Sequence, residues 1–178
     1  KVVRFIAEAR TMGITVLPPS VNQSDLDFTV ADGAIRFGLG AVKGVGTGAV
    51  EAIIGARNEG EPFESLFDFC ERVDLRRCNK RVMEALVKCG ACDDFNAPRA
   101  ALHSTIENAV ERGSRLQQDR LVGQTNLFGV LERVSAPKEA SQLYPDIEEW
   151  PTKVCLSYEK ECLGFYVSGH PLDRYVHD

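Results

Sequence analysis

Alternating glycines form the most distinctive chemical feature of this sequence. They stand in the run KGVGTG, whose residues are Lys43, Gly44, Val45, Gly46, Thr47 and Gly48. Glycine adopts backbone dihedral angles that other residues resist, and it lets a ligand approach the main chain closely. The amides of residues 46–48 precede an expected helix, where unpaired N–H groups and the helix dipole favour an anion. The run therefore predicts a turn that binds a phosphate group, with added contacts from Lys43 and the Thr47 hydroxyl.

A second turn, poor in glycine, lies in a stretch from Arg72 to Lys88 that has six basic and two acidic side chains. The cations expected around this turn are Arg76, Arg77, Lys80 and Arg81. Apolar Val50 and Ile53 after the glycines complete the pattern of a helix-hairpin-helix motif, and in the second turn cations replace backbone amides. Two such turns grip two points of a duplex backbone, so we predict salt-sensitive DNA binding without sequence preference. The alternative is a tight turn that only joins two packed helices.

Hydrophobic periodicity places these turns in a mainly α-helical chain with one small β-hairpin. Residues 2–12 have helical spacing, and alternation around a turn at residues 31–33 predicts a β-hairpin over about 26–39. Further helices are expected at 40–58 with the glycine turn inside, 62–73, 79–95 with Asn79 as its N-cap, 98–112 and 152–164. Residues 113–150 are polar and lack sustained periodicity, which predicts a loop or linker.

The overall composition limits the classes of protein that fit. At 44% hydrophobic residues the chain can bury a core, and no run approaches the roughly 18 apolar residues of a membrane helix. The six cysteines lie mostly in apolar helical patterns, which indicates reduced thiols in a cytoplasmic protein. The net charge of −5 argues against general affinity for nucleic acid but leaves a local phosphate site open. Since the sequence lacks an initial Met, we treat it as a piece of a longer protein.

Three other groupings of reactive residues are incomplete. Cys89 and Cys92 form a CxxC pair without a second pair at zinc-finger spacing, so we expect them in the core. Asp25 and Asp27 form a DxD pair that suits Mg²⁺, but no third carboxylate accompanies them. His170 has no nucleophile partner in a recognisable motif. The sequence therefore predicts neither a catalytic site nor a metal site of its own.

The sequence resembles the family of bacterial replicative DNA polymerase III alpha subunits in four blocks. These are MGITVLPPSVNQS, IRFGLGAVKGVGTGAVEAI, FESLFDFCERVDLRRCNKRVMEALVKCGA and EKECLGFYVSGHPLD. The resemblance implies the end of the fingers region over residues 1–39 and a tandem helix-hairpin-helix DNA-binding domain over 40–112. It further implies a linker with a clamp-binding peptide over 113–150, and a helix leading toward an OB-fold over 151–178.

Residue by residue, the family's first duplex-binding hairpin falls on Lys43–Gly48. Its basic second hairpin falls on Arg76, Arg77, Asn79, Lys80 and Arg81. The family also has an internal peptide that binds the sliding clamp, and its three anchor positions fall on Gln124, Leu127 and Phe128. For this Leu-Phe pair the alternative is that both side chains fold back on the neighbouring helix.

The resemblance implies a parent DNA-directed DNA polymerase that works in the cytoplasm, at the nucleoid, with primer–template DNA, the sliding clamp and other replisome subunits, and with no membrane. The family's catalytic carboxylates lie upstream and are not matched. We therefore expect this chain to be inactive alone and to hold no cofactor, while Mg²⁺ serves the parent enzyme. Two alternatives stay open. One is a structural spacer between fingers and OB-fold with little DNA affinity; the other is a repair-type nuclease or glycosylase, for which no catalytic Lys or Asp set is found.

Overall fold

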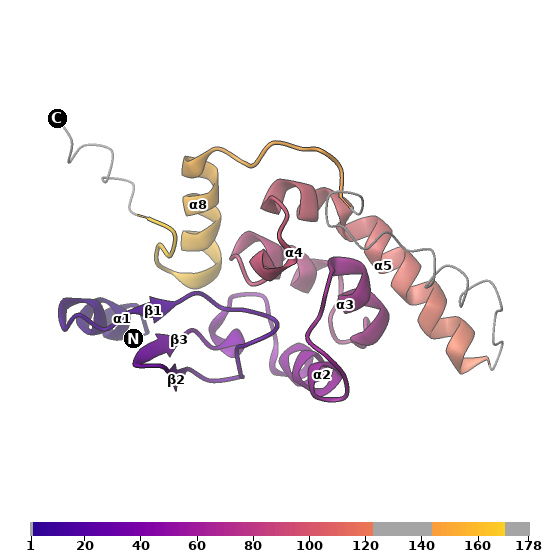
Figure 1. Ribbon diagram of the computed structural model, residues 1–178, viewed down its shortest axis with the longest axis horizontal. Helices are drawn as coiled ribbons and strands as arrows, with labels where there is room; N and C mark the ends of the chain where they lie inside the picture. Colours follow the sequence, from indigo (N-terminus) through magenta and orange to yellow (C-terminus); the bar gives the residue numbers. More distant parts are fainter. Residues whose placement is uncertain (1, 123–143, 170–178) are drawn as a thin grey trace.

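The computed structural model describes residues 2–122 and 144–169 (Figure 1). Its elements in chain order are α1 (Val2–Thr11), β1 (Val16–Leu17), β2 (Thr29–Ala31), β3 (Ala34–Arg36), the 3-10 turn η1 (Leu39–Ala41), α2 (Thr47–Asn58), α3 (Leu66–Arg72), α4 (Lys80–Lys88), the 3-10 turn η2 (Asp93–Phe95), α5 (Arg99–Leu121) and α8 (Thr152–Leu163). Mainly helical with one small sheet, this arrangement confirms the predicted fold class. In Figure 1 the sheet and α1 lie at one end, α5 lies at the other, and α2, α3 and α4 lie between them.

The sheet has three strands in the order β1-β3-β2. β2 and β3 form the predicted hairpin, with Val30 opposite Ile35. Asp32 and Gly33 make its turn with φ angles of 53° and 77°, as a two-residue turn between twisted strands requires. β1 pairs in parallel with the other edge of β3, with Val16 beside Ile35. Because this pairing joins segments distant in sequence, local periodicity does not reveal the third strand.

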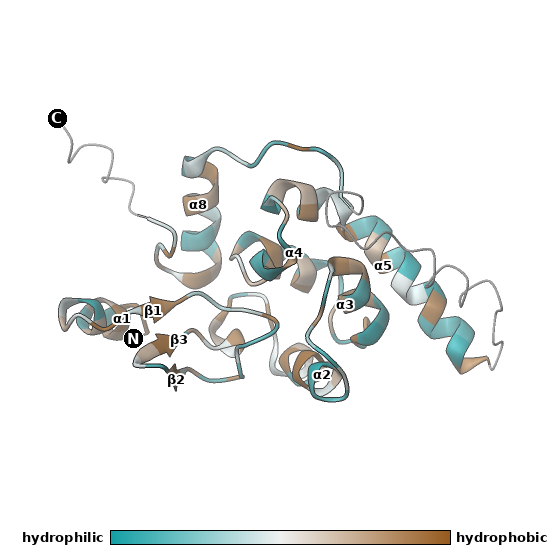
Figure 2. Ribbon diagram, viewed as in Figure 1, coloured by the Kyte–Doolittle hydropathy of each residue, from teal (hydrophilic) through white to brown (hydrophobic). Residues whose placement is uncertain are grey.

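A single hydrophobic core connects the sheet to the helices. Its large, fully buried side chains include Phe37, Phe69, Met83, Leu86, Leu102 and Ile106. Figure 2 shows hydrophobic segments in the strands and the central helices, whereas most of α5 is hydrophilic. Cys89 and Cys92 are also fully buried, as predicted, and burial raises the pKa of Cys89 to about 12. No helix in the described part of the chain is both long and apolar enough to cross a membrane.

The helix predicted to end near Arg112 is longer, and that prediction was wrong: α5 continues to Leu121. Gly113 lies so close to the carbonyl of Cys70 that a Cβ atom would clash with it. The Gln117 side chain donates from Nε2 to the carbonyls of Cys70 and Val73, each at 2.8 Å. These contacts hold a polar stretch of α5 on the end of α3. Tertiary packing therefore makes a helix of residues that show no helical periodicity.

Two other boundaries differ from the predictions. The helix expected over 79–95 ends at Lys88, since Gly90 takes a φ of 86° and turns the chain. The last part of the expected linker, residues 144–150, packs on the fold, and the Leu66 N–H donates to the hydroxyl of buried Tyr144 at 2.9 Å. The remaining linker residues, 123–143, lie outside the described residues. The predicted cap is present, because Asn79 Oδ1 accepts from the Val82 N–H at 3.2 Å.

Candidate nucleic-acid interface

The first turn presents unpaired backbone amides at the N-terminus of α2. Gly46 is the N-cap residue in an extended conformation, and its carbonyl accepts from the N–H groups of Ala49 and Val50 at 3.0 and 3.2 Å. Within the described residues, the N–H groups of Gly46, Thr47 and Gly48 have no acceptor, and all three residues are exposed. An anion fits this position, since unpaired N–H groups and the helix dipole converge there.

The glycines of the first turn differ in what the fold demands of them. Gly44 has a φ of 86°, a conformation that other L-residues adopt only with strain. A Cβ atom at Gly46 or Gly48 would meet nothing within 4 Å, and Gly46 has an ordinary φ of −77°. The fold therefore requires glycine at position 44 but leaves open space at positions 46 and 48. That space lets an approaching group reach the amides.

The second turn, between α3 and α4, presents side-chain cations. Arg76 Nε lies 3.1 Å from Asp74 Oδ1, and 88% of the Arg76 side chain is exposed. The hydrogen bond from Arg76 lowers the pKa of Asp74. Lys80 Nζ lies 3.5 Å from Glu107 Oε1, and exposed Arg81 has no ion pair among the described residues. Exposed ion pairs contribute little to stability, so phosphate groups can replace these carboxylate partners.

The two turns lie side by side. Arg77 Nη1 of the second turn is 3.7 Å from Glu51 Oε2 of α2, one helical turn beyond the free amides. A Cβ atom at Gly44 would lie 3.8 Å from Cβ of Ala85 in α4. We call residues 43–48 and 76–81 together the hairpin surface. The structure thus brings the two predicted sets of DNA-binding residues onto one surface.

Two of the predicted contact residues have structural roles in the turns. The Val45 side chain is buried in the core, so this residue anchors the first turn and exposes no side chain. The Asn79 side chain is engaged as the N-cap of α4. The Lys43 side chain is exposed, while its N–H donates to the carbonyl of Cys162 at 2.8 Å. The predicted clamp-binding residues Gln124, Leu127 and Phe128 lie outside the described residues.

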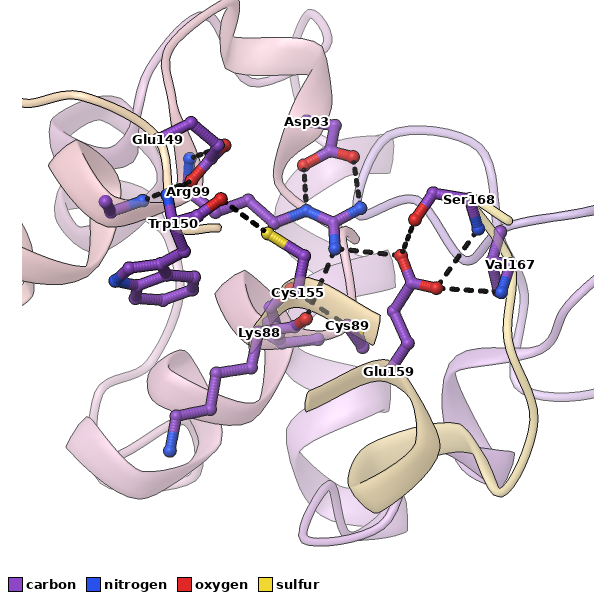
Figure 3. Close-up of polar contacts among 12 residues, drawn as sticks. Lys88, Cys89, Asp93, Arg99, Glu149, Trp150, Cys155, Glu159, Val167 and Ser168 are labelled. Carbon is purple, nitrogen blue, oxygen red and sulfur yellow. Dashed lines mark hydrogen bonds and ion pairs between the residues drawn. The ribbon is translucent and has the colours of Figure 1, made fainter. Parts of the chain in front are cut away.

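Sequence reasoning missed an ionic network, drawn in Figure 3, that is centred on the buried pair of Arg99 and Glu159 and extends to exposed Asp93. Arg99, at the start of α5, makes two hydrogen bonds to Asp93, with Nε–Oδ1 at 2.9 Å and Nη2–Oδ2 at 2.8 Å. Its Nη1 lies 3.0 Å from Oε1 of Glu159 in α8, whose side chain is 0% exposed. Because Arg99 and Glu159 lie 60 residues apart in the sequence, no local pattern could have paired them.

Glu159 stays ionised despite its burial. Desolvation opposes its charge, but the hydroxyl and N–H of Ser168, the N–H of Val167 and Arg99 donate to it and together lower its pKa. The donors lie close, with Ser168 Oγ at 2.6 Å and the Val167 N–H at 2.8 Å. The network therefore fixes α8 and the segment after it to the start of α5.

The resemblance drawn from the sequence implies Mg²⁺ for a longer polymerase. Within residues 2–122 and 144–169, no cluster of three or more His, Cys, Asp or Glu side chains is arranged to hold a metal ion. Asp25 of the DxD pair instead lies 3.2 Å from Nη2 of Arg57.

Comparison with known proteins agrees with this geometry. A family model described as "Helix-hairpin-helix motif" matches residues 13–102, about half of the chain. The chain belongs to this helix-hairpin-helix family.

Along nearly its whole length the chain is also similar to a segment of DNA polymerase III subunit alpha, which confirms the resemblance drawn from the sequence. The subunit of Vibrio cholerae serotype O1 is 48% identical over 177 residues, 99% of this chain and 15% of the relative. Those of Escherichia coli strain K12 and Haemophilus influenzae are 41% and 40% identical over the same shares of both chains. The chain thus spans about 15% of the length of these curated relatives.

Proposed function

We propose that this chain is part of a DNA-directed DNA polymerase and that its hairpin surface holds the backbone of duplex DNA. One observation carries the proposal. Three exposed amides without acceptors, at the N-terminus of α2, lie on the same surface as the exposed cations of the neighbouring turn. Similarity to DNA polymerase III subunit alpha supports the polymerase assignment. The duplex would be primer–template DNA, held during replication in the cytoplasm.

Amides and Lys or Arg side chains recognise phosphate groups and not base edges, so this binding is independent of sequence. Phosphate contacts release counterions from DNA, and affinity therefore falls steeply as the salt concentration rises. Glu51 and Glu107 already neutralise part of the cationic turn. For this reason we expect the surface alone to bind weakly and to act together with other contacts of the polymerase.

The test is a titration of labelled duplex DNA at two salt concentrations. In the double variant Lys80→Glu/Arg81→Glu, affinity at low salt should drop by about tenfold or more, since two phosphate contacts are lost and two repulsive charges are added. The matched control is Arg115→Glu/Lys153→Glu, which reverses one Arg and one Lys on exposed positions of α5 and α8. If low-salt binding is absent, the chain acts as the spacer considered above. If the control weakens binding as much as the double variant, the binding depends on net charge and not on the hairpin surface.

We propose, as a second contact, that Gln124, Leu127 and Phe128 tether the polymerase to the sliding clamp. The support is the motif itself: a Gln, two variable residues and an adjacent Leu-Phe pair that can anchor in an apolar pocket. Tethering raises the effective concentration of the polymerase at DNA, so two weak contacts give processive replication.

A pull-down with the clamp tests this tether. Leu127→Ala/Phe128→Ala should abolish clamp capture and leave the melting temperature unchanged. The matched control, Leu121→Ala/Val122→Ala, removes an exposed apolar pair just before the motif and should retain capture. A large fall in melting temperature for the first variant would place its side chains in the core.

A further inference from the structure

A groove of about 590 Å³ adjoins the hairpin surface, between the end of α3 and the C-terminal half of α5. Arg76 lines it from the second turn, while Ser114, Gln118 and Arg120 line it from α5. This part of α5 is the segment for which the sequence predicted a linker. The helix therefore supplies a second wall beside the cationic turn.

The walls of this groove, which we call the α5 groove, are held in place. Gln117 bridges the carbonyls of Cys70 and Val73, and Arg120 Nη1 donates to the carbonyl of Glu71 at 3.2 Å. Gly113 permits the close approach of α5 to α3. A ligand thus meets a helix whose backbone is already positioned, with the side chains of Gln118 and Arg76 exposed on the groove.

The chemistry of the α5 groove favours an anion with several acceptor oxygens. Its charged lining comprises Arg72, Arg76, Arg120, Glu71 and Asp74, an excess of one positive charge. Both acids are already paired: Glu71 Oε1 lies 3.2 Å from Nε of Arg112, and Asp74 pairs with Arg76. Arg72 Nη1 is held by Asp68 Oδ2 at 3.1 Å, so within the described residues Arg120 is the lining cation without a carboxylate partner. Ser114 and Gln118 add exposed polar groups. Arg, Ser and Gln side chains are common partners of nucleic-acid phosphates.

The groove also continues the hairpin surface. Arg76 belongs to both, and the next residue, Arg77, reaches Glu51 beside the free amides of α2. We propose that the α5 groove binds the phosphate backbone of the same duplex beyond the second turn, so that α5 is a third DNA-contacting element. This inference rests on the proposed function.

Substitutions of Gln118 test the groove. Its exposed side chain makes no hydrogen bond to the described residues, and Gln, Glu and Lys have similar helix propensities. Gln118→Glu should weaken duplex binding about threefold or more at low salt, and Gln118→Lys should strengthen it and steepen the salt dependence by up to about 0.9 in log–log slope. Thermal melting should show both variants as stable as the parent chain.

Arg115→Glu on the same helix is the control, because Arg115 lies outside the groove and pairs with Glu111 at 3.5 Å. It changes the charge by two, yet it should weaken binding less than Gln118→Glu. An equal or larger effect of the control would contradict DNA binding by the α5 groove. It would indicate that only long-range charge changes the affinity. If the Gln118 variants bind normally while Lys80→Glu/Arg81→Glu does not, the groove fails and the proposed function stands. If none of the variants alters binding, both fail.

Discussion

The two turns of the hairpin surface offer different groups to the same kind of ligand. The first offers main-chain amides at a helix N-terminus, and its small residues leave them accessible. The second offers long cationic side chains, most of them held by nearby carboxylates. The fold itself fixes the position and polarity of the amides, whereas the cations can move and exchange partners. The first turn thus provides geometry, and the second provides most of the charge.

The two turns also rest on different supports. The first is tied to α8 by the Lys43 N–H, which donates to the carbonyl of Cys162. The second lies between α3 and α4, which both pack against α5. Arg99 of α5 and Glu159 of α8 join the two supports at a buried ion pair. This pair therefore links the two supports, while the turns also meet directly through Arg77 and Glu51.

The largest effect on the free energy of unfolding should come from removing the ion pair of Arg99 and Glu159. Arg99→Met leaves the carboxylate of Glu159 buried without its cation, and loss of one partner of a buried pair costs about 3–5 kcal/mol. Urea unfolding of the variant measures this free energy. Arg115→Met, at an exposed pair, should change it by less than about 0.5 kcal/mol. Similar losses in both variants would show that the buried pair has no special role.

The ion pair of Arg99 and Glu159 also makes the stability of the fold depend on pH. Because the pKa of Glu159 is lowered in the folded state, its ionised form stabilises the fold above the pKa of the unfolded chain. This contribution is lost as the pH falls through the lower, folded pKa. Unfolding measured between neutral and acidic pH should therefore show a loss of stability in the parent chain that is smaller in Glu159→Gln. An identical acid dependence in both would contradict this role.

The sequence predicts the two turns because their signals are local. Three closely spaced glycines mark the first, and Asn79 three residues before Val82 marks the cap of α4. The supports carry no such signal. Arg99 and Glu159 meet only in the fold, and Gly113 looks like a helix breaker until its contact with α3 is seen. Long-range packing decides these positions, so local periodicity could not predict them.

Within the first turn, Gly44 links the stability of the fold to ligand binding. Its φ of 86° makes Gly44→Ala cost about 1–2 kcal/mol through backbone strain. DNA affinity should fall with it, because the turn that presents the amides is distorted. Thermal melting and duplex titration measure the two effects together. Undiminished stability would show that the turn relaxes without strain.

Gly48→Ala should instead separate the stability of the fold from its affinity for duplex DNA. The new methyl group meets no atom of the protein, and alanine in a helix is more favourable than glycine by up to about 1 kcal/mol. Stability should therefore be equal or higher, while duplex affinity should fall because the methyl group takes up open space at the N-terminus of α2 that a phosphate would need. If affinity is unchanged, the amides do not approach a phosphate closely, and the second turn carries the binding alone.

The smallest effect should come from the ion pair that joins the two turns. Glu51→Gln removes the partner of Arg77 and one negative charge beside the free amides. Duplex affinity should rise about two- to threefold at low salt, and the gain should shrink as salt screens it. Glu111→Gln makes the same change at the pair with Arg115, away from the hairpin surface, and should leave affinity nearly constant. Equal gains in both variants would mean that net charge alone matters. A gain confined to Glu51→Gln would show that Arg77 and the amides of α2 act on the same stretch of backbone, so that the flexible turn and the rigid one form a single site.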